Sequence, residues 1–196
     1  MKGKALDHDS QYEKAISSFN KALEIKPDLI KVLFNKGNVL DHLGRYDESI
    51  ATYESIIALR PDSYKAWNNK GLTLARIPDQ RVESIKAYDV AISIKPDYYE
   101  AWLNKGNAAV RIRRYDDAVK AYDRAIQIKP TEHVAWANKG FTLADQGENE
   151  KALEAFNKAI ELKPDSYAAW NGKGLSLDKL GKNEDAIIAY KKAVVI

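Results

Sequence analysis

The sequence contains no cysteine, which excludes disulfide frameworks, thiolate metal sites and cysteine nucleophiles. Only three histidines occur among 196 residues, too few for a histidine-rich metal site. The 31 basic and 28 acidic residues nearly balance, so no strongly basic surface is expected for a nucleic-acid backbone. No apolar run approaches the ~20 residues of a membrane span, and the first residues lead into no signal-peptide core. We therefore expect no metal, cofactor, membrane or nucleic-acid partner, and a cytoplasmic location.

Proline and glycine are scarce, at six and ten residues, but both recur at one spacing. Five prolines follow one another at intervals of 34 or 35 residues: Pro27, Pro61, Pro96, Pro130 and Pro164. Six glycines keep the same intervals: Gly3, Gly37, Gly71, Gly106, Gly140 and Gly174. A shared period of about 20–50 residues is typical of a stacked-repeat solenoid. The single extra residue falls near Ile77–Gln80, so we expect a loop there that absorbs an insertion.

Each period contains two helical segments. Between Trp102 and Ala109 apolar residues recur at helical spacing, the pattern breaks at 113–115, and it resumes around Tyr122. Pro130 then ends the second segment, because proline lacks a donor and clashes with the preceding turn. Glycines mark the turn between the two segments in three periods: Gly44, Gly147 and Gly181. The pattern predicts a row of helical hairpins.

These units resemble tetratricopeptide repeats, 34-residue helix–turn–helix motifs with tryptophan, glycine, alanine, phenylalanine and proline at set offsets. The fifth unit carries this series in order: Trp136, Gly140, Ala152, Phe156, Ala159 and Pro164. One departure is consistent, since lysine replaces the family's leucine before the repeat glycine: Lys36, Lys70, Lys105, Lys139 and Lys173. A lysine stem can lie along an apolar seam while its ammonium stays in water. The resemblance implies an all-α, right-handed superhelical solenoid of antiparallel helix–turn–helix repeats.

The register predicts a single array over residues 1–196. Full repeats are expected at 30–63, 64–98, 99–132 and 133–166, with a nearly full one at 167–196. The first, 1–29, is expected to be a truncated repeat that lacks the start of its first helix, as in a piece cut from a longer array. No polar capping helix follows the last repeat, although solenoids normally need one. We therefore predict self-association into a homo-oligomer through uncapped ends.

The resemblance also implies a function, because first helices in this family line a concave groove that binds extended peptides. Two residues before the repeat glycine stand four asparagines: Asn35, Asn69, Asn104 and Asn138. An asparagine amide can pair with both polar groups of a peptide bond. This series is similar to asparagine ladders that hold peptide backbones in the family. The alternative is that these asparagines bond locally between adjacent helices, and both roles can coexist.

Other groove positions interleave polar and apolar residues. Asn38 and Asn107 follow the repeat glycine and add amides beside the ladder. Phe34, Leu72 and Phe141 are the predicted side-chain pockets for the ligand. The alternative for these residues is partly buried filler between neighbouring first helices.

Other functions find less support. Some family members bind chaperone tails through a carboxylate clamp, a set of lysine, asparagine and arginine residues on successive first helices. No alignment of these repeats supplies the full set. Catalytic motifs such as GxSxG, HExxH and GxGxxG are absent, so we do not expect an enzyme. We therefore predict a protein–protein interaction scaffold that binds an extended peptide. Two alternatives remain: a structural or oligomerisation module that uses the repeat ends, and an RNA-binding helical-repeat protein.

Overall fold

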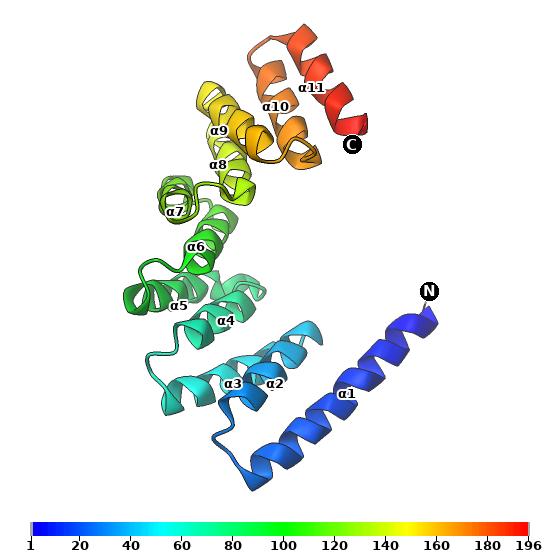
Figure 1. Cartoon of the computed structure of the whole chain (residues 1–196), viewed down its shortest axis with the longest axis vertical. Helices are drawn as coiled ribbons and strands as arrows, with labels where there is room; N and C mark the ends of the chain where they lie inside the picture. Colours follow the sequence, from blue (N-terminus) through cyan, green and yellow to red (C-terminus); the bar gives the residue numbers. More distant parts are fainter. Residues whose placement is uncertain (1, 196) are drawn as a thin grey trace. The chain divides into compact units, whose positions relative to one another are not determined.

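The computed structural model describes residues 2–195, with side chains from residue 10 onward, and this range contains helices and turns but no β-strand. The chain divides into two compact units, Met1–Pro96 and Asp97–Ile196 (Figure 1). The first unit contains α1 (Lys2–Ile25), α2 (Ile30–His42), α3 (Tyr46–Leu59), α4 (Tyr64–Leu74), the short 3₁₀ helix η1 (Pro78–Gln80) and α5 (Arg81–Ile94). The second contains α6 (Tyr99–Arg111), α7 (Tyr115–Ile128), α8 (His133–Asp145), α9 (Asn149–Leu162), α10 (Tyr167–Lys179) and α11 (Asn183–Val195).

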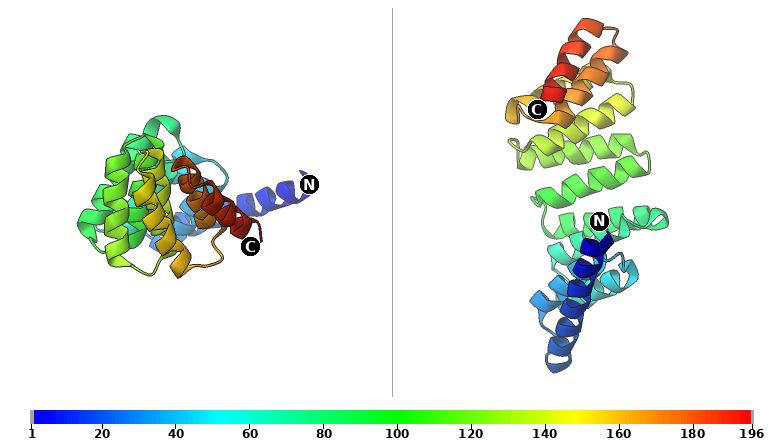
Figure 2. Two further views of the ribbon diagram at one scale, coloured as in Figure 1. Left: turned by 90° about the horizontal axis from the view of Figure 1, so that it is seen from above. Right: turned by 90° about the vertical axis from the view of Figure 1, so that its right-hand side faces the viewer.

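From α2 onward, each even-numbered helix packs against the helix that follows it to form a hairpin. Figure 2 shows the helices of the second unit running back and forth in successive layers. Within each unit the second helix of one hairpin also contacts the first helix of the next, as α3 contacts α4 and α9 contacts α10. The fold is therefore a solenoid of helical hairpins, and one hairpin lies within each predicted repeat from residue 30 onward.

The repeat glycine is explained by an aromatic ring that packs directly against the first helix. Tyr53 is 1 % exposed, and a Cβ atom added at Gly37 would lie 2.8 Å from its Cε1. At Gly106 the added atom would lie 2.5 Å from Cε1 of Tyr122. The same close approach recurs at Gly71–Tyr88, Gly140–Phe156 and Gly174–Tyr190. Any larger residue would force the two helices of a hairpin apart.

The tryptophans are half-buried, and indole hydrogen bonds fasten linkers between hairpins. The indole Nε1 of Trp67 donates to the carbonyl of Pro61 at 3.1 Å. The same bond recurs from Trp136 to Pro130 at 3.1 Å and from Trp170 to Pro164 at 2.8 Å. Trp136 and Trp170 also pack against buried clusters in their hairpins. Tryptophan and proline therefore share one period because they form one local structure.

The turns inside the hairpins have three different structures. Gly44, Gly147 and Gly181 have φ values of +75°, +83° and +73°, the left-handed region that glycine tolerates best. Arg113 takes the same role in the fourth repeat with φ of +61°. In the third repeat the 3₁₀ helix η1 replaces this turn, which confirms the loop predicted near the extra residue.

The first repeat, predicted at 1–29, contains one helix. α1 is one continuous helix, with no turn between a partial first helix and a second helix. Ser10 stands where a turn glycine would be expected, 34 residues before Gly44, so no residue there favours a left-handed turn. Arg45 fixes α1 to the next hairpin, because its Nη1 donates to both carboxylate oxygens of Glu13 at 3.0 and 3.1 Å.

Candidate functional site

We call the surface that carries the four ladder positions on the first helices the inner face of each unit. On the inner face of the first unit, Asn38 accepts two hydrogen bonds at its Oδ1. The hydroxyl of Tyr53 donates at 2.6 Å and Nδ2 of Asn69 donates at 3.3 Å. Burial raises the pKa of Tyr53 to about 12, so this hydroxyl stays protonated and donates. Three side chains from α2, α3 and α4 thus link one hairpin to the next.

The second unit repeats this arrangement. The hydroxyl of Tyr122 donates to Oδ1 of Asn107 at 2.8 Å, and Nδ2 of Asn138 donates to the same oxygen at 2.9 Å. We call each such group of asparagine, tyrosine and ladder asparagine an amide set. In both amide sets the ladder asparagine bonds between adjacent hairpins, which is the local role considered as an alternative for it.

Between the last two hairpins, apolar residues on α8, α9 and α10 replace the amide set. Phe141 and Phe156 stand where the amide sets have asparagine and tyrosine, and their ring centroids lie 4.9 Å apart in an edge-on contact. The ladder position is Gly172, and a Cβ there would lie 2.5 Å from Cε1 of Phe156 and 3.0 Å from Cε1 of Phe141. Glycine interrupts the ladder here because the two rings occupy the space of a side chain.

The remaining predicted residues are placed individually. Asn35 is exposed and makes no hydrogen bond through its side chain to any described residue, whereas Asn104 is half-buried. Phe34 packs against the cluster around Tyr53, with the two ring centroids 6.3 Å apart. Leu72 is 40 % exposed. Of the three predicted pocket residues, Phe34 and Phe141 are thus partly engaged in packing against the second helix of their own hairpin, and Leu72 is the one most open to a ligand.

A concavity of about 300 Å³ lies on the inner face of the second unit, between α6 and α8. It brings together three of the predicted residues, Asn107, Asn138 and Phe141. Arg111 and Asp145 also line it, so the charges around it have both signs.

The amides of this concavity retain unused hydrogen-bonding groups. Asn107 uses its Oδ1, and its Nδ2 makes no hydrogen bond to a described residue. Asn138 uses one Nδ2 hydrogen, and its Oδ1 makes none. One amide therefore offers a donor and the other an acceptor, which are the groups that complement a peptide bond.

In the first unit an ion pair crosses the inner face. Nε of Arg76, in the turn that follows α4, lies 3.2 Å from Oδ2 of Asp41 on α2. The corresponding ladder amide is also more fully used, since Oδ1 of Asn69 accepts from Nδ2 of Asn68 at 3.2 Å. The inner face of the second unit thus has the more open amide set.

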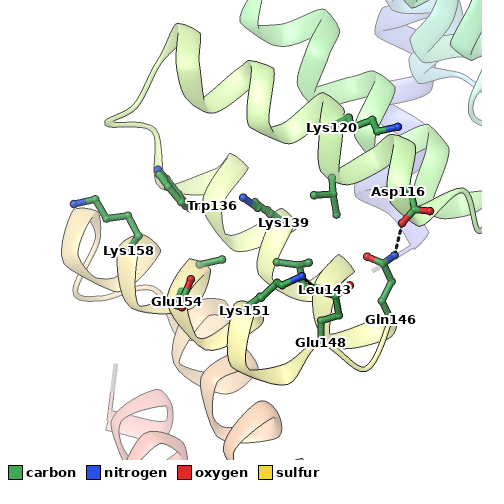
Figure 3. A pocket seen from close by; sticks show the side chains of 12 residues that line it. Asp116, Lys120, Trp136, Lys139, Leu143, Gln146, Glu148, Lys151, Glu154 and Lys158 are labelled. Carbon is green, nitrogen blue, oxygen red and sulfur yellow. Dashed lines mark hydrogen bonds and ion pairs between the residues drawn. The ribbon is translucent and has the colours of Figure 1, made fainter.

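Sequence reasoning missed a second type of hollow, which we call the outer clefts. Each lies between the second helices of two successive hairpins, over the first helix between them: α3–α5 (about 430 Å³), α7–α9 (about 760 Å³) and α9–α11 (about 410 Å³). Their floors repeat one trio: Trp67, Lys70 and Leu74; Trp136, Lys139 and Leu143; Trp170, Lys173 and Leu177. Figure 3 shows the α7–α9 cleft, with Trp136, Lys139 and Leu143 between two walls of charged side chains.

The outer clefts explain why lysine replaces the expected leucine before the repeat glycine. Nζ of Lys70 lies 5.5 Å from the ring centroid of Trp67, and that of Lys139 lies 5.9 Å from Trp136. Each ammonium also pairs with an acid from the preceding second helix, Lys70 with Glu54 at 2.7 Å and Lys139 with Asp123 at 2.6 Å. The acid stands 16 residues before its lysine in both cases, a spacing that could have been found from the sequence.

Two other kinds of site do not occur in the part of the chain that the structure describes. No group of three or more acidic, histidine or cysteine side chains there is arranged to hold a metal ion. None of the described helices is both long enough and apolar enough to cross a membrane.

Sequence comparisons agree with the observed architecture. Three sequence models described as tetratricopeptide repeat match residues 8–70, 99–132 and 139–196. No curated protein matches the chain.

Several solved structures share the fold. A crystal structure of MamA is 24% identical with a TM-score of 0.75, over 84% of this chain and 90% of that one. YrrB, described as a TPR protein with an unusual peptide-binding site, is 20% identical with a TM-score of 0.70 over 90% of each chain. A tetratricopeptide repeat protein from Parabacteroides merdae is 17% identical with a TM-score of 0.79, over 99% of this chain and 77% of that one. At these identities the similarity concerns the fold.

Proposed function

Because the chain belongs to the tetratricopeptide repeat family, we propose that it is a protein-interaction scaffold that binds an extended peptide on its inner face. The observation that carries this proposal is the concavity between α6 and α8, where two amides with unused groups lie beside an aromatic ring. YrrB, which shares the fold, is described as having a peptide-binding site, and this supports the class of ligand.

The amide set suits a peptide backbone for a specific reason. Tyr122 and Asn138 both donate to one oxygen of Asn107, which fixes the orientation of that amide and directs its Nδ2 away from them. In our proposal this Nδ2 donates to a peptide carbonyl, while Oδ1 of Asn138 accepts from a peptide N–H. Preorganised polar groups bind a ligand with a smaller loss of conformational entropy than mobile ones.

Side-chain selectivity would then come from the surroundings of the amides. Phe141 presents a half-buried ring, while Arg111 and Asp145 bring opposite charges to the same hollow. A ligand with a strong charge of one sign would gain little here, because one of the two groups would repel it. We therefore propose backbone recognition with a preference for an uncharged, apolar residue beside Phe141, and no catalytic role.

Peptide arrays can test the proposal directly. The labelled chain is incubated with immobilised random peptides, and Asn138→Ala is compared with the unaltered protein. Removing the amide should weaken binding about tenfold, since it removes an acceptor for the peptide worth ~1 kcal/mol and frees the orientation of Asn107. Tyr122→Phe is the matched control, because it also removes a hydrogen bond to Asn107 but leaves both outward-facing groups in place.

The two variants separate recognition from packing. If Asn138→Ala loses peptides that Tyr122→Phe still retains, and both keep the helical circular dichroism spectrum, the amide contacts the ligand. If both variants bind as the unaltered chain does, or lose binding together, the asparagine has only a structural role. If the unaltered chain retains no peptide, the proposed function is wrong.

A further inference from the structure

The α9–α11 cleft differs from the other two outer clefts in the charge balance of its lysine. Its floor holds Lys173, whose Nζ lies 5.4 Å from the ring centroid of Trp170. The position 16 residues earlier, which supplies the acids of the other two clefts, is Asn157. Lys173 forms no ion pair with any residue that the structure describes, and Asp185, the acidic residue that lines this cleft, does not pair with it.

The other outer clefts show what this lysine lacks. Lys70 and Lys139 are about one-fifth exposed, at 19% and 22%, and each meets a carboxylate at 2.6–2.7 Å. A half-buried ammonium without such a partner gives up hydration and receives no charge in return. The two clefts therefore show that a carboxylate fits beside this lysine, and in the α9–α11 cleft no described residue supplies one.

The wall of this cleft has changed as well. Ile188 on α11 is 58% exposed and lines the cleft, at the position where the α3–α5 cleft has Lys86 and the α7–α9 cleft has Glu154. Leu153 on the opposite wall and Leu177 on the floor are apolar too. One cation and a set of apolar side chains thus line the same hollow of about 410 Å³.

We propose that the α9–α11 cleft is a second binding site, separate from the inner face, for a protein segment that places one acidic side chain next to an apolar one. The carboxylate pairs with Lys173 over the face of Trp170, in the position that Asp123 takes in the neighbouring cleft. The apolar side chain packs on Ile188 and Leu153. Asp185 repels a second negative charge, so the site selects a single acid within an apolar segment over an acidic run.

The test uses the full chain labelled with nitrogen-15 and two blocked tripeptides as probes, acetyl-Leu-Glu-Leu-amide and its glutamine analogue. Amide chemical shifts are followed as each peptide is added to millimolar concentration. We expect saturable shifts on α9, α10 and α11 with the glutamate peptide, and binding weaker by about tenfold with the glutamine peptide, since a charge-assisted hydrogen bond is lost.

Two exchanges between clefts sharpen the test. Asn157→Asp supplies the missing acid from within the chain, and the new carboxylate should pair with Lys173. Binding of the glutamate peptide should then be about tenfold weaker, while the fold is kept. Asp123→Asn removes the acid that neutralises Lys139, so it should create a new set of shifts on α7, α8 and α9. Lys173→Gln should abolish the difference between the two peptides.

Several results would overturn the inference. Equal affinity for the glutamate and glutamine peptides would show that Lys173 does not distinguish a charged side chain from an uncharged one. Unchanged binding in Asn157→Asp, or shifts confined to the inner face of α6 and α8, would place the acidic peptide elsewhere. An absence of saturable shifts at millimolar peptide would show that the cleft is not a site for this chemistry. Each of these outcomes leaves the proposal for the inner face standing, because the peptide-array test uses different residues.

Discussion

Introducing asparagine at Gly172 should destabilise the last hairpin, although asparagine is the usual residue at this ladder position. A Cβ at 172 would lie 2.5 Å from Cε1 of Phe156 and 3.0 Å from Cε1 of Phe141, both much closer than an ordinary contact. Phe156 is fully buried, so its ring has no free space into which to move. The chain would have to shift α10 away from α9 to accept the new side chain.

The size of this effect can be estimated from its parts. Overpacking a tightly filled site costs about 1–3 kcal/mol. Replacing glycine within a helix returns only a few tenths of a kcal/mol for asparagine. Gly172→Asn should therefore lower the free energy of unfolding by about 1–3 kcal/mol.

The amide sets predict how the defect can be repaired. Adding Phe141→Asn and Phe156→Tyr to Gly172→Asn recreates the pattern of Asn107, Tyr122 and Asn138. Of the two hydrogen bonds in this pattern, only the one donated by the asparagine at 172 depends on that residue, and it is worth about 1 kcal/mol. The asparagine at 172 should thus cost about 1 kcal/mol less in the altered background than in the unaltered chain.

Urea unfolding followed by circular dichroism measures these differences. The double variant Phe141→Asn with Phe156→Tyr supplies the second background, and Leu175→Asn is a control at an exposed position of the same helix. The control should change stability by no more than about 0.5 kcal/mol. The reasoning is refuted if Gly172→Asn is as stable as the unaltered chain, or if its cost is the same in both backgrounds.

Two further predictions concern single residues. Burial raises the pKa of Tyr53 in the folded protein to about 12, above the ~10 of an unfolded tyrosine. The protonated hydroxyl therefore stabilises the fold fully below pH ~10, and about 2–3 kcal/mol of the free energy of unfolding is lost as the pH rises through 12. Urea midpoints measured from about pH 9 to pH 12 should fall less steeply in Tyr53→Phe, and an equal slope would contradict the assignment. Arg113→Gly should raise the free energy of unfolding by up to about 1 kcal/mol and Tm by about 2–4 °C, because φ of +61° disfavours a residue with a Cβ. Gly147→Arg should lower Tm in a matched melt. A fall in Tm for Arg113→Gly, or a rise for Gly147→Arg, would show that φ does not govern the stability of these turns.

The spacing of glycine and proline was enough to predict the hairpins, because each residue has a local geometric reason to recur. Gly106 recurs because an aromatic ring touches the helix backbone, and Pro130 recurs because it ends a helix and accepts a bond from tryptophan. The continuous α1 could not be predicted in the same way. There the expectation came from the period alone, and Ser10 provides no turn geometry to support it.

The candidate site was predicted as a set of positions but not as a set of contacts. The sequence identifies Asn138 as a ladder residue, Asn107 as a groove residue and Tyr122 as part of the apolar pattern of a second helix, each from its own position in the repeat. The structure shows that the three form one unit. The signal for this was present in the sequence, since Asn107, Tyr122 and Asn138 change together to Phe141, Phe156 and Gly172. Finding it required comparison of positions across the boundary between two repeats.

Because each set of three contacting residues spans two successive repeats, the array cannot be cut and recombined at every position with the same result. A duplicated or transplanted block of 133–166 would bring Phe141 and Phe156 beside a foreign ladder residue, and an asparagine there would meet the two rings. A block of 139–172 keeps all three together, although it starts and stops inside a first helix. The module that can be exchanged without loss is therefore offset from the visible hairpin, and grafts made at the 139–172 limits should fold where grafts made at the linkers do not.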